Sequence, residues 1–167
     1  MKRIKFVALA LCLAAPLAAL AQSQKAPSQK NELYKGGFQY NSVGATPPTD
    51  DSLYQALGGK EKISAFTAEF VGLISQDDRI GHYFAKNRLD HLRRMLTDQF
   101  IELSGGPVAY RGRDIAEVHS TMGITNADFN RLAENLQVAM DHQGVPFPTQ
   151  NRLVALLASM QRAVVTK

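Results

Sequence analysis

The sequence predicts an all-α domain over residues 51–167, and three observations lead to that prediction. From about residue 51 onward, apolar residues recur at spacings of three and four, the period of a helix with one buried face. Glycine pairs and short polar turns separate these periodic stretches, and no segment alternates as a strand would. Of the 167 residues, 45% are hydrophobic and 20% are charged, which suits a protein with a packed core.

The first half of this domain is expected to hold three helices. Asp51 and Ser52 are candidate N-caps of a short helix that ends at the glycine pair 58–59. A second helix follows and ends at the polar turn 76–78; its buried face carries Ile63, Phe66, Phe70 and Ile74. A third helix ends at 105–107, and its stripe carries Leu89, Leu92, Leu96, Phe100 and Leu103.

The second half predicts a short helix over about 114–122, a longer helix and a final helical segment. Thr125 or Asn126 caps the longer helix, which ends near Gly144 and turns Phe129, Leu132, Leu136 and Met140 inward. The last apolar face carries Leu153, Leu156, Leu157, Met160 and Val164. We found no internal repeat in the sequence.

Residues 1–21 have the layout of a secretory signal peptide. A basic start is followed by an apolar run over 6–20 and by a small-x-small sequence at 19–21. The alternative is a membrane anchor, but the run is short of the roughly 20 apolar residues that a span needs, and Pro16 interrupts it. We therefore expect an exported protein, periplasmic or secreted, with no membrane span after cleavage.

Removal of this leader changes what the chain can bind. Three of the 19 basic residues and none of the 15 acidic residues lie in 1–21, so the remaining chain carries a net charge of about +1. That charge gives no support to nucleic-acid binding. Cys12, the only cysteine, also lies in the leader, so the mature chain has no thiol for a disulfide or a metal site. Leu11 stands before Cys12 where a lipoprotein signal needs a small residue.

Residues 22–50 are rich in Gln, Ser, Asn, Gly, Pro and Thr, which predicts a flexible linker or N-terminal arm. Tyr34, Phe38 and Tyr40 stand out in this composition; they could dock on the domain, which we favour, or be sticky residues without a docking site.

Among the four histidines, His119 has the most distinctive surroundings. It lies four residues after Ile115, so the two share a helix face, and Val118 and Met122 flank that face. An imidazole in an apolar groove is suited to bind a haem iron through one nitrogen while the other donates to a carbonyl. From the spacing alone, a hydrogen-bonded core histidine is the more common alternative. The histidines show no HxxxH pair, and the chain contains no GxSxG or P-loop sequence.

Taken together, the motifs of residues 51–164 resemble those of the truncated haemoglobins, most closely the group I branch. The matching pieces are Leu53 to Gly59, Glu69-Phe70, Gln76 to Ile80, Tyr83-Phe84, Gly105 to Pro107, Tyr110 to Gly112, Val118-His119, Met122 to Thr125, Phe129 and Gly144 to Pro146. Each piece is short, but their order and separations are specific.

The resemblance implies a globin-like, two-over-two helical sandwich that encloses haem b. His119 matches the family's proximal iron ligand, and Phe84 matches the phenylalanine that packs against the haem face. The resemblance also implies a diatomic gas as ligand and a reductase or other electron donor as a candidate partner.

The distal side departs from the family. Where group I members carry a tyrosine after Phe70 and often a glutamine one turn after Leu92, this chain has Val71 and Leu96. The aligned distal residues are Phe70, Val71, Phe84, Leu92, Met95 and Leu96, and Val118, Met122 and Phe129 are further haem contacts. Without a donor worth roughly 1.5–3 kcal/mol, oxygen retention should fall by about one to two powers of ten.

Three functions are consistent with this pattern. The first is a haem protein that binds oxygen, nitric oxide or carbon monoxide, without being a dedicated enzyme. The second is a haem redox enzyme acting on nitric oxide or peroxide. The third is an electron-transfer protein in which Met95 supplies a sixth iron ligand; the alternative for Met95 is a core filler.

Overall fold

The computed structural model describes residues 43–85 and 88–167, and this part of the chain is helical without a strand. The prediction of an all-α domain is therefore confirmed. The expected signal peptide and the aromatic residues Tyr34, Phe38 and Tyr40 lie outside the described residues.

Seven α-helices and one 3-10 turn make up the described part of the chain. In order, they are α1 (Ser52–Ala56), α2 (Gly59–Gln76), η1 (Gly81–Tyr83), α3 (Leu89–Leu103), α4 (Ile115–His119), α5 (Asn126–His142), α6 (Phe147–Ala158) and α7 (Gln161–Val164).

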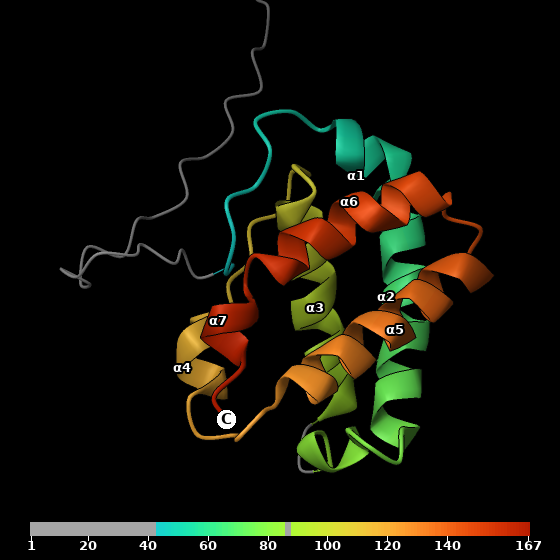
Figure 1. The fold of residues 1–167 in the computed structure, drawn as a ribbon. Helices are drawn as coiled ribbons and strands as arrows, with labels where there is room; N and C mark the ends of the chain where they lie inside the picture. The colour runs from blue at the N-terminus through green and yellow to red at the C-terminus, as the bar shows by residue number, and fades with distance from the viewer. Residues whose placement is uncertain (1–42, 86–87) are drawn as a thin grey trace, which may run out of the picture.

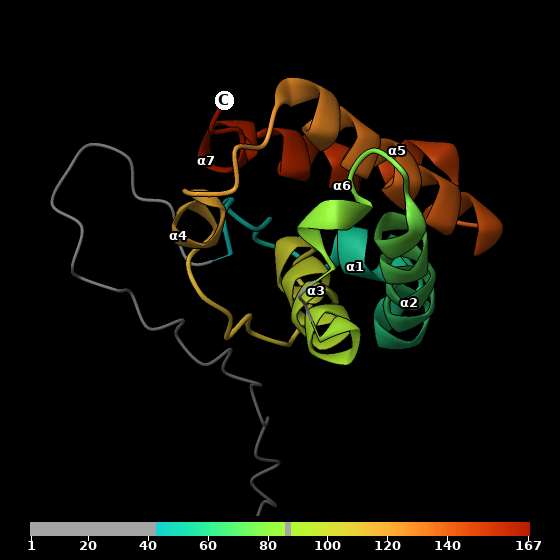
Figure 2. The same ribbon diagram turned by 90° about the horizontal axis from the view of Figure 1, so that it is seen from below.

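The long helices form two layers, with α2 and α3 in one and α5 and α6 in the other (Figures 1 and 2). Between them, the rings of Phe66 and Phe70 lie 5.9 and 6.1 Å from the ring of Phe100, measured between centroids. Leu136 and Met140 of α5 are fully buried against the same cluster. This arrangement is the expected two-over-two sandwich.

Asp77, at the end of α2, joins the two layers. Its carboxylate accepts hydrogen bonds from Asn135 Nδ2 (3.0 Å) and Arg131 Nε (2.6 Å), both on α5. It also accepts from the backbone N–H of Arg79 in the turn that follows. These donors, Asn135 first, hold the pKa of Asp77 well below its usual range.

Local sequence signals explain both ends of α5. Thr125 and Asp128 form a reciprocal capping box at the start of α5, and Gly144 follows the end of α5 with a φ of 65°. The last apolar face proved to be two helices, because the chain turns at Ser159 and Met160 between α6 and α7. The turn leaves Met160 4% exposed in a core cluster with Ile115 of α4.

One predicted buried position is wrong. Leu89, the first residue of α3, is 40% exposed. Within the described residues, no helix has both the length and the apolar character that a membrane crossing requires.

Candidate functional site: a cavity beside His119

A cavity of about 490 Å³ lies where α3, α4 and α5 approach one another. Its volume is within the usual range for small-molecule and cofactor sites. Its lining includes nine of the ten residues predicted to contact a cofactor: Phe70, Phe84, Leu92, Met95, Leu96, Val118, His119, Met122 and Phe129. These residues come from four helices and from the turns after η1 and α4, so the fold, not a local motif, assembles the site.

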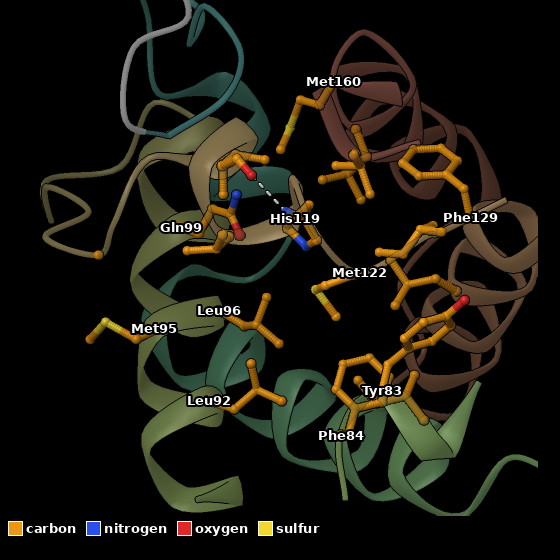
Figure 3. A pocket seen from close by; sticks show the side chains of 18 of the residues that line it. Tyr83, Phe84, Leu92, Met95, Leu96, Gln99, His119, Met122, Phe129 and Met160 are labelled. Carbon is orange, nitrogen blue, oxygen red and sulfur yellow. Dashed lines mark hydrogen bonds between the residues drawn. The ribbon is translucent and has the colours of Figure 1, made fainter. Parts of the chain in front are cut away.

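His119 is the last residue of the short helix α4 and turns its ring toward the cavity (Figure 3). Its Nδ1 lies 2.7 Å from the carbonyl oxygen of Ile115, one turn earlier in the chain. Because a carbonyl only accepts, Nδ1 carries the proton, and in the neutral ring Nε2 keeps its lone pair. Burial lowers the pKa of His119, and the bond to Ile115 opposes this in part, so the neutral form is favoured. The ring is thus set to offer one nitrogen as a metal ligand.

Val71 is the predicted contact that the cavity lacks. It is 4% exposed on α2, next to Phe70, but it is not part of the cavity lining. Successive helical residues are turned by about 100°, so with Phe70 directed into the cavity, Val71 faces a different side of α2.

Met95 lines the cavity but does not point the same way as the leucines of α3. Figure 3 shows Leu92 and Leu96 directed into the space beside His119, whereas Met95 extends from the opposite side of the helix. Its thioether is therefore directed away from the side of α3 that His119 faces.

The inner wall of the cavity offers few hydrogen-bond donors. Leu92, Leu96 and Phe70 have none. The hydroxyl of Tyr83 donates to Asp128 Oδ2 at 3.1 Å and so already has an acceptor. Burial and this carboxylate raise the pKa of Tyr83, so the hydroxyl keeps its proton.

Several polar and charged side chains stand at the exposed rim, and the half-buried Asp128 also lines the cavity. Arg88, His91 and Arg113 contribute to the lining and are exposed to solvent. Tyr110 closes the rim beside them, with its hydroxyl donating to the carbonyl of Arg113 at 3.1 Å. A Cβ on Gly112 would come within 2.1 Å of the Tyr110 ring, so this closure requires glycine there.

Sequence reasoning missed Gln99, which lines the cavity and is 4% exposed. Its Nε2 donates to the carbonyl oxygen of Val43 at 3.1 Å. The signal was available, because Gln99 lies three residues after Leu96 and seven after Leu92, on the same helix face. Val43 belongs to the predicted linker, which therefore contacts the domain at least over its last residues.

The remaining histidines have other surroundings. The ring of His82 lies 4.0 Å from that of Tyr83, and Nδ1 of His142 hydrogen-bonds to the carboxylate of Glu69. Among the residues that the structure describes, no three His, Cys, Asp or Glu side chains gather as a metal site would require.

Comparison with known proteins gives a consistent result. The family model described as "Bacterial-like globin" matches residues 52–166. The chain is 28% identical over 116 residues to a group 1 truncated hemoglobin of Tetrahymena pyriformis, covering 70% of this chain and 96% of that protein. It is 34% identical over 104 residues to the group 1 truncated hemoglobin GlbN of Synechocystis, covering 57% and 80%. The crystal structure of the Tetrahymena pyriformis protein in its Fe(III) form superimposes with a TM-score of 0.67 at 28% identity, covering 69% of this chain and 98% of that one.

Proposed function

Because the chain belongs to the bacterial-like globin family and has the fold of the truncated haemoglobins, we propose that it binds haem through His119 and takes up a diatomic gas beside an apolar wall. Haem binding follows from the family. The proposal adds the ligand residue, the b-type haem and the character of the ligand pocket.

The orientation of His119 is the observation that carries the proposal. The Nδ1–H bond to Ile115 fixes the ring and leaves Nε2 free to coordinate. The lowered pKa keeps that nitrogen unprotonated near neutral pH, so no proton has to leave before a metal is bound.

The rest of the cavity also fits a porphyrin. A haem is a flat apolar disc with two carboxylates at one edge. Phe84, Leu92, Met122 and Phe129 supply apolar walls, and the exposed Arg88 and Arg113 stand at the rim, where carboxylates would meet cations and water. Once bound, the haem would supply an iron with a free sixth position for a gas.

The wall then determines which gases are held. Leu92, Leu96 and Phe70 are apolar and provide no donor. The binding of carbon monoxide and nitric oxide depends little on a hydrogen bond. Dioxygen gains negative charge on binding, so its affinity falls most when no donor is present. We therefore favour carbon monoxide or nitric oxide over stable oxygen storage.

The placement of Met95 supports a five-coordinate iron over His/Met ligation, because the thioether extends from the side of α3 opposite to Leu96. A redox enzyme acting on peroxide is less well supported, since Asp128, the carboxylate among the described lining residues, already accepts hydrogen bonds from Tyr83 and Thr125.

An absorption titration tests the proposal. The purified mature chain is mixed with haemin, and ferric, ferrous and carbon monoxide spectra are recorded for the wild type, His119→Ala and the remote control His142→Ala. We expect one haem per chain and a five-coordinate ferrous spectrum that carbon monoxide shifts, with only His119→Ala losing the histidine signature. An unchanged signature in His119→Ala would contradict the assignment.

We also propose that the protein is exported. The basic, apolar and small-residue order of residues 1–21 supports this. Cell fractionation with N-terminal sequencing should find the chain outside the cytoplasm, beginning near Gln22; an intact N-terminus on cytoplasmic protein would refute it.

A further inference from the structure

We propose that residues 43–45, here called the strap, are a working part of the haem site because they hold α4 and His119 in position. The inference rests on His119 being the haem ligand. It goes beyond the family relationship, because the family match begins only at residue 52.

The first contact joins the strap to the cavity wall. Val43 is 1% exposed, and its carbonyl oxygen accepts from Nε2 of Gln99 at 3.1 Å. Gln99 is itself 4% exposed and lines the cavity. A buried amide bonded to a buried carbonyl is costly to separate, because each group would lose its partner away from water.

The second contact joins the strap to α4. Gly44 has a φ of 93°, and a Cβ there would lie 2.6 Å from Cε of Met160 and 3.0 Å from Cγ1 of Ile115. The strap thus passes close against the first residue of α4 and against the turn before α7. Only glycine combines this backbone conformation with this closeness.

The third contact leads from α4 to the ligand. The carbonyl of Ile115 accepts from Nδ1 of His119 at 2.7 Å. Since α4 has only five residues, it is too short to be stable by itself and depends on its neighbours for its position. Val43 and Met160 belong to the buried cluster around Ile115. A shift of the strap would therefore move the acceptor that orients the His119 ring.

Gln99→Met tests this, because it keeps the length of the side chain and removes the amide. Gln150→Met is the matched control: Gln150 is 2% exposed and donates to the carbonyl of Val145 at 2.9 Å, but it does not line the cavity. Both variants are made in the full chain and loaded with haem. The readouts are the iron–histidine stretching band, the rate of haem loss to an acceptor protein, and hydrogen exchange.

In Gln99→Met we expect a shifted iron–histidine band and haem loss about three- to tenfold faster, the effect of one hydrogen bond. Amide exchange should rise together in 43–50 and 115–119. Gln150→Met should leave all three unchanged. Equal behaviour of the two variants would overturn the strap proposal while leaving haem binding by His119 intact.

Gly44→Ala provides a second test, because Gly44 itself is not one of the residues that line the cavity. It displaces the strap from Ile115 and Met160, so the iron–histidine band should shift as it does in Gln99→Met. A wild-type band in haem-loaded Gly44→Ala would contradict the proposal. Failure of the wild type to bind haem through His119 would instead refute the proposed function.

Discussion

Replacing Leu96 by glutamine is expected to slow the release of dioxygen from the ferrous protein. Leu96 projects into the cavity from α3, beside Leu92 (Figure 3). Glutamine is similar in size to leucine and places two N–H donors beside Leu92 and Phe70, which have none. Tyr83 does not offer its hydroxyl as a donor to dioxygen, because that hydroxyl donates to Asp128.

The structure limits the size of the effect. A hydrogen bond to a charged group contributes roughly 1.5–3 kcal/mol, but Leu96 is only partly buried, so the lower end of that range applies. At about 1.4 kcal/mol per power of ten, dioxygen release should slow by roughly tenfold. Carbon monoxide release should change by less than about twofold, because carbon monoxide gains little from a donor.

Stopped-flow displacement of dioxygen by carbon monoxide measures both rates. Leu96→Met is the control, because it has a similar volume and no N–H donor; it should release dioxygen at nearly the wild-type rate. If Leu96→Gln and Leu96→Met release dioxygen at the same rate, the absence of a donor at position 96 does not determine how tightly dioxygen is held.

Two further predictions concern pH and stability. Because the pKa of His119 is lowered by burial, haem uptake by the apoprotein should decline with a midpoint below the ordinary histidine value of 6.5 as the pH falls. Stopped-flow mixing at a series of pH values measures this midpoint, and a midpoint at or above 6.5 would contradict the prediction. Asp77→Ala should lower the free energy of unfolding at pH 7 by about 2 kcal/mol. Because the folded pKa of Asp77 is depressed, this difference should be present above its ordinary value of 3.8 and vanish as the pH falls further, and denaturant unfolding would measure it.

The sequence predicted the helices where a local signal existed. The glycine pair at 58–59 marks the end of α1, and the capping residue Thr125 marks the start of α5. The break between α6 and α7 has no such signal, because the apolar period continues through Met160. That break depends on tertiary packing around Ile115, which a one-dimensional pattern does not contain.

In the candidate site, too, some features could be predicted from local sequence and others depended on the fold. His119 could be singled out because Ile115 and Val118 give its helix face an apolar character. The position of Val71 depended on how far α2 is rotated about its axis, which sequence similarity alone does not determine. The contact between Gln99 and Val43 joins residues 56 positions apart, so only the folded structure could reveal it.

The most direct test of the central claim is the iron–nitrogen stretching band of His119→Gly loaded with haem. We predict that this band is absent without added imidazole, returns when imidazole fills the space left by the ring, and shifts when the imidazole carries ¹⁵N. A band that persists without imidazole and ignores the isotope would show that a different side chain binds the iron.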